Sequence, residues 1–160
     1  KAFINGRMEF RAKFGEAQGA WPAIWMMPEG LPWPQGGEID VVEHLNFDSI
    51  AYQTIHTPFT LAGNEGPKQS VTHPIKRNDY NVYAVELYPD SLRFFINDEL
   101  TLCYPKVEEL GPDQFPFTDE FYILISNQVG GNWVGAYDTE QLPVEIYVDW
   151  IRFYQREGEN

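Results

Sequence analysis

Three short β-strands joined by two tight turns are predicted by the segment 81-NVYAVELYPDSLRFFINDELTLCY-104. Pro89-Asp90 separates the first two apolar runs, and Asn97-Asp98 separates the second run from the third. Turns prefer these residue types because proline fixes, and asparagine and aspartate tolerate, the backbone angles that reverse a chain. Alternating apolar residues on either side of such turns are typical of antiparallel strands. The segment therefore predicts a β-hairpin followed by a third strand.

The same pattern continues outward from this hairpin in both directions. Further alternating segments lie at 49–57, 120–128 and 144–155. Helical periodicity is confined to about one turn at 106–110. Short strands separated by Gly, Pro, Asn and Asp favour an antiparallel sandwich or barrel. The segment 58–74 is predicted to be a long polar loop, and a connection of this length can border a functional site.

Composition limits the kinds of partner that the protein can have. The 160 residues carry a net charge of -13, so nucleic acids and anionic membranes are disfavoured as partners. The single cysteine, Cys103, excludes an internal disulfide and a cysteine-based zinc cluster. No apolar run reaches the length of a membrane-spanning segment. Aromatic residues make up 16% of the chain, which fits a sugar-binding surface and a large aromatic core equally well. The oligomeric state is left open.

Three acidic side chains interrupt an apolar run in 37-GEIDVVEHLN-46. In a regular strand, Glu38 and Asp40 share one face, whereas Glu43 falls on the other. A β-bulge at Val41-Val42 adds one residue and returns Glu43 to the face of Glu38. Because an unpaired charge in the core costs several kcal/mol, we expect all three acids to lie on a solvated, concave face.

Acids arranged in this way can perform glycosidic chemistry. A retaining glycosidase needs two carboxyl groups about 5–5.5 Å apart, one as nucleophile and one as acid/base. The charge of Asp40 between the two glutamates separates their pKa values, so that one can be protonated while the other is ionised. The pattern alone also fits a solvated acidic strand edge or a calcium site, since clustered carboxylates suit a hard cation.

The sequence around these acids resembles glycoside hydrolase family 16. The motifs that carry the resemblance follow in this order: 6-GRMEFRAKF-14, 20-AWPAIWMMP-28, 33-WPQGGEIDVVEHL-45, 51-AYQTIHT-57, 81-NVYAVELYPDSLRFFIND-98, 121-FYILISNQVGGNW-133 and 146-IYVDWIRFYQ-155. The resemblance implies an all-β fold, an antiparallel jelly-roll β-sandwich with a concave substrate cleft. The bulged acidic spacing is similar to that of the laminarinase and agarase branch.

The resemblance also assigns a role to each acid. Glu38 corresponds to the nucleophile, Asp40 to its electrostatic helper and Glu43 to the general acid/base. The implied activity is that of a retaining endo-β-glycosidase without a catalytic cofactor. Its implied partner is a polysaccharide, either a β-1,3-glucan or a β-galactan or mucin-type glycan. The alternative is a non-catalytic carbohydrate-binding or scaffold protein of the same fold, but such relatives typically lose one glutamate, and both are present here.

The chain departs from the family at its start. Typical members have several more strands before the segment that matches 6–10, so the N-terminal strands are apparently missing. The chain opens on Lys1 rather than Met and shows no signal segment. We therefore interpret residues 1–160 as a single, N-terminally truncated catalytic domain, and we expect a secreted, periplasmic or cell-surface location.

A second departure concerns the substrate. Laminarinases usually have apolar residues where the segment 126-SNQVGG-131 has Asn127 and Gln128. An axial hydroxyl, as on galactose, needs a hydrogen-bonding partner at an angle that an equatorial hydroxyl does not. A site built to bond one hydroxyl rejects sugars that misplace it. Asn127 and Gln128 therefore favour galactose-containing substrates over plain β-1,3-glucan.

Three tryptophans are candidate substrate-binding residues. Trp33 and Trp133 fall in predicted loops, where sugar stacking explains a large ring better than core packing does. Trp25 shares a strand face with Trp21, and we expect at least one of these two in the core.

Polar candidates include His56, which has the strand parity of Tyr52, and Gln128; sugar binding and a structural hydrogen bond are equally open for both. His44 is expected to be structural. Asp149 matches a position at which many relatives bind a structural calcium ion, but its usual partners come from the missing strands, so the metal site is a weak prediction.

Overall fold

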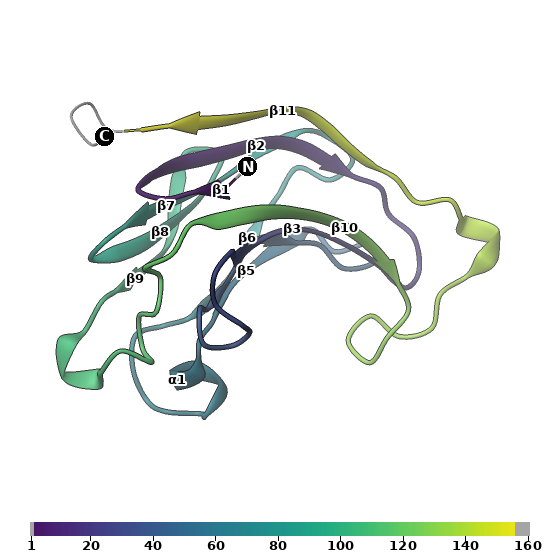
Figure 1. Ribbon diagram of the computed structural model, residues 1–160. Coiled ribbons are helices and arrows are strands. Elements are labelled where there is room, and N and C mark those ends of the chain that lie inside the picture. The colour runs from purple at the N-terminus through teal and green to yellow at the C-terminus, as the bar shows by residue number, and fades with distance from the viewer. Residues whose placement is uncertain (1, 156–160) are drawn as a thin grey trace.

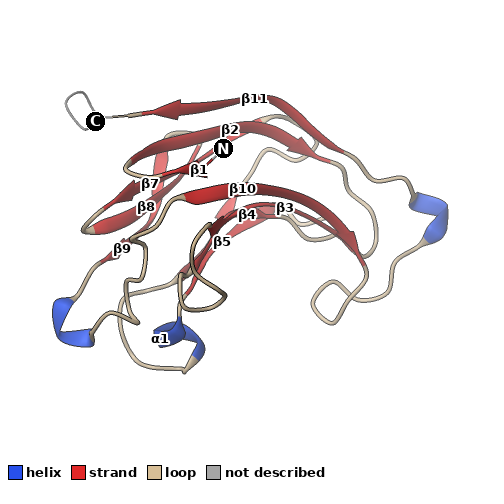
Figure 2. Ribbon diagram, in the orientation of Figure 1, coloured by secondary structure: helices blue, strands red, loops and turns tan. Residues whose placement is uncertain are grey.

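Two antiparallel β-sheets stacked face to face make up the fold in the computed structural model, which describes residues 2–155 (Figures 1 and 2). The six-stranded sheet contains, in spatial order, β1 (Ala2–Phe3), β10 (Phe121–Val129), β3 (Ala20–Pro28), β4 (Glu38–Glu43), β5 (Ile50–His56) and β6 (Ser70–Pro74). The five-stranded sheet contains β11 (Ile146–Tyr154), β2 (Gly6–Phe14), β7 (Asn81–Tyr88), β8 (Ser91–Ile96) and β9 (Glu99–Pro105). The prediction of an all-β sandwich is confirmed.

Both sheets are curved, and the six-stranded sheet turns its concave face away from its partner (Figure 1). The short helix α1 (Pro58–Leu61) lies on this concave side, and the two remaining helical turns are η1 (Glu108–Leu110) and η2 (Thr139–Gln141). Among residues 2–155, no helix is both long enough and apolar enough to cross a membrane. The concave face is therefore the place where the fold can accommodate a long ligand.

Strict alternation in the strands produces the core between the sheets. In β2, Met8, Phe10 and Phe14 are buried, whereas Arg11 and Lys13 between them face outward. Burying each large apolar side chain contributes about 1.5–3 kcal/mol. The core is thus assembled from one face of each strand, and the opposite face of the six-stranded sheet is left for function.

The predicted hairpin is present. β7 and β8 pair antiparallel from Tyr88, which lies opposite Ser91, so Pro89-Asp90 forms the turn. At the next turn, Asn97 and Asp98 both adopt positive φ angles, of 51° and 66°. Two successive residues of positive φ form the turn type that matches the twist of paired strands, and asparagine and aspartate tolerate it.

The segment predicted as one long loop is partly regular. It contains α1, whose N-cap Thr57 exchanges hydrogen bonds with Thr60, and the edge strand β6. Only Val71 is apolar in the middle of β6, so this strand lacks the alternation by which a strand is detected. The expected helical turn at 106–110 is a 3-10 turn at Glu108–Leu110.

At one end of the sandwich, the sheets expose apolar side chains on the faces that are elsewhere buried. Ile125 and Val129 of β10 are 44% and 37% exposed, and Ile151 of β11 is 41% exposed. On the outer edge of β10, β1 pairs only with Phe121 and Tyr122. The core is consequently less complete here than around β4, where the acids lie.

Candidate active site

A β-bulge in β4 sets the directions of the three acids. On the β3 side, Ile24 pairs with Val42 and Trp25 pairs with Asp40, which leaves Val41 as the extra residue. On the β5 side, Asp40 pairs with Thr54 and Glu43 pairs with Tyr52, so two residues of β4 lie opposite the single residue between those partners. The bulge predicted from the acid spacing is therefore confirmed.

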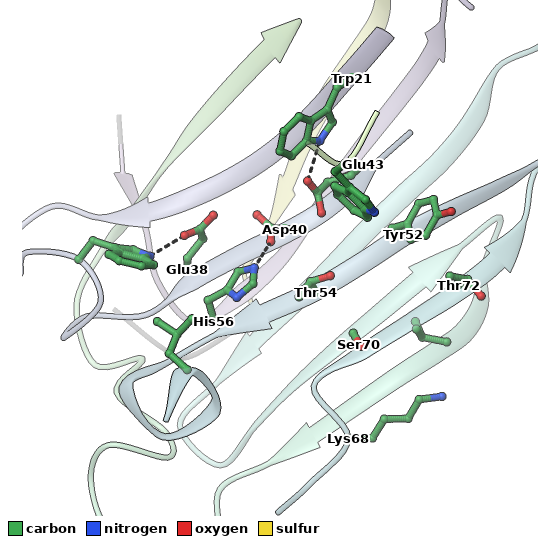
Figure 3. Close-up of a pocket in the computed structure, with 14 residues that line it drawn as sticks. Trp21, Glu38, Asp40, Glu43, Tyr52, Thr54, His56, Lys68, Ser70 and Thr72 are labelled. Carbon is green, nitrogen blue, oxygen red and sulfur yellow. Dashed lines mark hydrogen bonds and ion pairs between the residues drawn. The ribbon is translucent and has the colours of Figure 1, made fainter. Parts of the chain in front are cut away.

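Because of this extra residue, Glu38, Asp40 and Glu43 all line one cleft on the concave face, with a volume of about 770 Å³ (Figure 3). The volume lies within the usual range of ligand sites. The residues that line the cleft come from β3, β4, β5, β6, the helix α1 and the loops beside them: Trp21, Trp33, Glu38, Asp40, Glu43, Tyr52, Thr54, His56, Leu61, Lys68, Ser70, Val71, Thr72 and Trp133.

Glu43 has the environment of a proton donor. Its residue is 8% exposed, and Trp21 Nε1 donates a hydrogen bond of 2.8 Å to its Oε1. Burial and then the charge of Asp40 raise the pKa of Glu43 to about 7, although the Trp21 hydrogen bond opposes this shift. A carboxyl group with this pKa is substantially protonated at neutral pH and can act as a general acid.

Glu38 has a different set of contacts. Trp33 Nε1 donates a hydrogen bond of 2.6 Å to Glu38 Oε2. Burial and the charge of Asp40 raise the pKa of Glu38, whereas His56 and the Trp33 hydrogen bond lower it. The last two contacts favour the ionised carboxylate, which is the form that a nucleophile needs.

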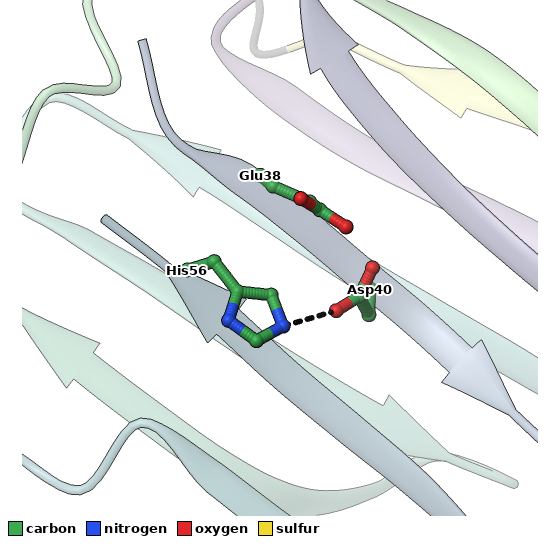
Figure 4. A group of neighbouring side chains, drawn as sticks. All are labelled: Glu38, Asp40 and His56. Atoms are coloured by element: carbon green, nitrogen blue, oxygen red, sulfur yellow. Dashed lines mark ion pairs between the residues drawn. The ribbon is translucent and has the colours of Figure 1, made fainter. Parts of the chain in front are cut away.

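Asp40 connects the acids to a histidine. It is 4% exposed, and its Oδ2 lies 3.2 Å from His56 Nε2 (Figure 4). The hydrogen bond to Asp40 raises the pKa of His56 against the opposing effect of burial. His56 therefore carries positive charge more readily than a free histidine and partly compensates the negative charge of the cleft.

Metal-type donors come together at this same place. Glu38, Asp40 and His56 offer ligand atoms within 4.8 Å of one another. Calcium prefers six to eight oxygen ligands, and here the histidine nitrogen already contacts Asp40. The contact present is thus an ion pair between two side chains of the cleft, and these residues do not fit a calcium site.

The predicted calcium ligand has a different partner. Asp149 lies at a bulge in β11 and forms an ion pair with Arg11. Among residues 2–155, no group of three or more metal-type donors includes Asp149. A single carboxylate that is already neutralised by a guanidinium does not fit calcium, so the residues described here do not support that site.

The two loop tryptophans, Trp33 and Trp133, both reach the cleft. Trp33 is 52% exposed and Trp133 is 47% exposed, and both line the cleft. The ring of Trp133 packs edge-on against Trp21 and Tyr52, with centroids 5.3 and 5.2 Å away. These contacts hold one wall of the cleft rigid.

A smaller recess of about 150 Å³ adjoins the acids on the β10 side. Trp25 and Gln128 line it, and Trp25 Nε1 donates to Ser126 Oγ at 3.2 Å. Asn127 has the opposite parity and donates to the Val144 carbonyl at 2.7 Å. Of the two polar residues singled out in this strand, Gln128 is therefore the one that can meet a ligand.

The expectation that Trp21 or Trp25 lies in the core is wrong. Both side chains line recesses of the concave face. Ile24 and Met26, of the opposite parity in the same strand, fill the core and are fully buried. His44 is structural as predicted, since it is buried and its Nε2 lies 2.7 Å from the Asp48 carbonyl oxygen.

Sequence reasoning did not single out several residues of the cleft. Tyr52 and Thr54 share the strand parity of His56, which was a usable signal. Lys68 and Ser70 lie in the segment predicted as a loop, so nothing indicated which way their side chains point. The hydrogen bond from Trp21 to Glu43 depends on strand register and had no local signal.

Comparison with known families gives a match over nearly the whole chain. A family model described as glycosyl hydrolases family 16 matches residues 1–152. A keratan-sulfate endo-1,4-beta-galactosidase of Sphingobacterium multivorum is 39% identical over 154 residues, covering 94% of this chain and 36% of that protein. A beta-glucanase of Rhodothermus marinus is 34% identical over 169 residues, covering 96% of this chain and 58% of that protein. The chain thus spans 36% and 58% of the lengths of these two relatives.

Solved structures match the fold closely. The laminarinase of Rhodothermus marinus has a TM-score of 0.86 at 33% identity, covering 97% of this chain and 67% of that one. A structure from a study of endo-acting O-glycanases of the human gut microbiota, which initiate mucin breakdown, has a TM-score of 0.86 at 32% identity, covering 98% of this chain and 71% of that one.

Proposed function

The chain belongs to glycosyl hydrolase family 16, and on this premise we propose that it is a retaining endo-β-glycosidase that cleaves a glycan chain lying in the concave cleft. One observation carries the proposal. The bulge in β4 turns both glutamates into the same cleft, and their contacts differ. Burial raises the pKa of Glu43 to about 7 and favours its protonated form. Burial and Asp40 also raise the pKa of Glu38, but His56 and the Trp33 hydrogen bond oppose that shift and favour its ionised form.

The first step breaks the glycosidic bond. Glu43 donates its proton to the leaving oxygen while a carboxylate oxygen of Glu38 attacks the anomeric carbon, and a covalent glycosyl-enzyme forms. Glu38 loses its negative charge to the new bond as Glu43 becomes ionised, so the net charge of the site does not change; His56 stays in contact with Asp40 in the same cleft.

The second step releases the sugar. Glu43, now ionised, removes a proton from water, and the water oxygen attacks the anomeric carbon and displaces Glu38. Two displacements at the same carbon restore the original β-configuration. Glu43 then carries a proton again, and both glutamates are ready for the next cycle.

Both glutamates are present and hydrogen-bonded in the cleft, which favours the enzyme over a non-catalytic carbohydrate-binding or scaffold protein. Trp21 holds one oxygen of Glu43, and Trp33 holds one oxygen of Glu38. A surface used only for binding has no need of two carboxyl groups that are oriented in this way.

We direct the substrate proposal to β-galactoside chains, and among them to chains that carry anionic substituents. The relative with 39% identity is named for keratan sulfate, and Gln128 provides a hydrogen-bonding group beside the acids. Of the residues described, Lys68 is the one lysine or arginine that lines the cleft. None of the ion pairs among the described residues includes Lys68.

The place of Lys68 suits a substituent on a nearby sugar. Across the sheet, Asp40 of β4 pairs with Thr54 of β5, and Thr54 pairs with Ser70 of β6. If the antiparallel pairing of β5 with β6 is continued by two residues on each strand, Lys68 lies opposite His56. Two strand spacings, roughly 10 Å, then separate Lys68 from the backbone of the catalytic strand. A sulfate group within this reach would meet the ammonium group of Lys68, whereas a neutral glucan would leave it without an anion.

Hydrolysis of β-1,3-glucan is the second candidate activity. It is favoured by the relative named beta-glucanase at 34% identity and by the laminarinase structure at 33% identity. Exposed Trp33 and Trp133 suit the faces of either sugar.

A panel of polysaccharides tests the proposal. The full-length protein is incubated with keratan sulfate, chemically desulfated keratan, agarose-type galactan, mucin-type glycan and laminarin, and the products are sized. Proton NMR of the first products identifies the anomer. We expect internal cleavage of galactoside chains with an initial β-anomer. An initial α-anomer refutes the retaining mechanism, and faster cleavage of laminarin than of every galactoside refutes the substrate proposal.

We also propose that the protein works outside the cytoplasm, at the cell surface, in the periplasm or after secretion. The support is chemical, because polymeric substrates of this kind do not cross a membrane intact. Cell fractionation followed by immunodetection tests it, and an exclusively cytoplasmic signal would refute it.

A further inference from the structure

The catalytic strand depends on a bulge, and a bulge leaves backbone groups without a partner in the ladder. The extra residue, Val41, is fully buried, so water cannot satisfy its carbonyl group. Gln53 Nε2 donates a hydrogen bond of 2.8 Å to this carbonyl. Gln53 lies on β5 directly opposite the bulge, between the residues that pair with Asp40 and Glu43, and it is fully buried as well.

The other end of the Gln53 side chain reaches the opposite sheet. Its Oε1 accepts a hydrogen bond from Thr101 Oγ1 on β9. Thr101 is itself the extra residue of a second bulge, since Phe94 pairs with Leu102 and Phe95 pairs with Leu100. One buried glutamine therefore connects a bulge in one sheet with a bulge in the other across the core.

This connection bears on catalysis because the bulge decides which way Glu43 points. Without the extra residue, strand alternation would turn Glu43 towards the core, whereas Glu38 would stay in the cleft. The hydrogen bond from Gln53 is made to the carbonyl of the extra residue itself, two positions before Glu43. Apolar packing alone does not distinguish the bulged strand from a slipped one, because Val41 and Val42 are both apolar.

We propose that Gln53 is a positioning residue of the active site, which holds the β4 bulge in the register that turns Glu43 into the cleft and is anchored for this task by Thr101. This inference rests on the proposed glycosidase function for its kinetic readout. It assigns no chemical step to Gln53, which does not line the cleft.

The test compares Gln53→Leu with Gln114→Leu in the full-length protein. Gln114 is a matched control, because it is also fully buried and uses both ends of its amide in hydrogen bonds. Both of its partners are backbone groups: it accepts from Val107 N at 2.9 Å and donates to the Pro105 carbonyl at 3.0 Å. It does not line the cleft. Gln53→Leu leaves the Val41 carbonyl without its hydrogen bond, and Gln114→Leu does the same to Val107 N and the Pro105 carbonyl. Both variants are therefore expected to lower the melting temperature.

Only Gln53→Leu is expected to change catalysis. Misplacement of a catalytic group by about 1 Å can cost on the order of a hundredfold in rate, so we expect kcat to fall roughly 10- to 100-fold with KM within about threefold. A relaxed bulge exposes Glu43 to water, so the alkaline limb of the pH profile moves to lower pH. Carbon-13 NMR of the Glu43 carboxyl group follows the same titration without any turnover.

Variants of Thr101 keep the proposal falsifiable if Gln53→Leu fails to fold. Thr101→Val removes the anchoring hydroxyl group and is expected to produce a smaller change of the same kind, and Thr101→Ser is expected to restore the wild-type values. The proposal is overturned if folded Gln53→Leu or Thr101→Val has wild-type kcat and an unmoved Glu43 titration, or if Gln114→Leu changes both equally. A wild-type protein without hydrolase activity refutes the proposed function instead, and the NMR titration still tests the positioning role.

Discussion

Replacing Glu43 with glutamine should stabilise the protein while it removes activity. Glu43 is nearly inaccessible to solvent and lies close to the charge of Asp40, so its ionised form is unfavourable in the folded state. Glutamine has the same shape and keeps an oxygen that can accept the Trp21 hydrogen bond, but it carries no charge. It cannot donate a proton to a leaving group, so hydrolysis should be lost.

The magnitude follows from proton linkage. The pKa of Glu43 is about 7 in the folded state, against 4.5 for the unperturbed group. At about pH 8 the carboxyl group is ionised in both states, and the shift destabilises the folded state by about 3 kcal/mol. At about pH 4 it is protonated in both states, and this cost is close to zero. Because a raised pKa means that stability is lost as pH rises, the gain from glutamine should appear only at the higher pH.

Urea unfolding of the wild type and of Glu43→Gln at these two pH values provides the assay. We expect the variant to gain roughly 2–3 kcal/mol at about pH 8, which corresponds to a melting temperature higher by roughly 4–12 °C for a domain of this size. Exposed Glu109 provides the control, since Glu109→Gln should change stability little at either pH. A gain of equal size at both pH values, or no gain at the higher one, would refute the reasoning.

Three further outcomes are expected. Glu38→Gln should abolish hydrolysis, leave oligosaccharide binding nearly unchanged and not lower the melting temperature, since burial and Asp40 also raise the pKa of Glu38; turnover within tenfold of wild type would contradict its role as nucleophile. The value of kcat/KM should fall as pH rises through about 7, where Glu43 loses its proton, and should fall again at low pH as Glu38 becomes protonated, which a pH-rate profile measures. Lys68→Met should lower kcat/KM on keratan sulfate about three- to tenfold and leave desulfated keratan unaffected. The control is Lys76→Met, because Lys76 is exposed and does not line the cleft. Activity of the Lys68 variant on sialylated mucin-type glycan separates recognition of a carboxylate from recognition of a sulfate. If Lys68→Met lowers kcat/KM equally on sulfated and desulfated keratan, Lys68 has no part in the substrate proposal.

Much of the fold follows from local pattern. Alternation with a period of two shows which residues of a strand share a face, and it correctly predicted the hairpin around Pro89-Asp90. It also predicted the bulge at Val41-Val42, because three acids can share one solvated face only if one residue is added. These features are set by neighbours in the chain, so the sequence by itself determined them.

Local pattern did not predict which face of the sheet some side chains point to. Trp21 and Trp25 were known to share a face, but alternation does not say which face is the core, and a tryptophan suits both settings. The polar strand β6 has no apolar alternation, so the position of Lys68 in the cleft was invisible. In both cases the deciding fact is which sheet packs on which face.

The pKa of Glu43 and the hydrogen bonds that hold the β4 bulge depend on the tertiary structure alone. The pKa of about 7 at Glu43 results from burial by parts of the chain that are distant in sequence. The link from Val41 through Gln53 to Thr101 joins residues that are far apart along the chain and meet only when the two sheets close on each other. The sequence by itself determined which residues form strands and which acids share a face, because these depend on local geometry. Only the tertiary structure decided how strongly each acid holds its proton and what holds the bulge, because desolvation and hydrogen bonding across the core exist only after the sheets have packed.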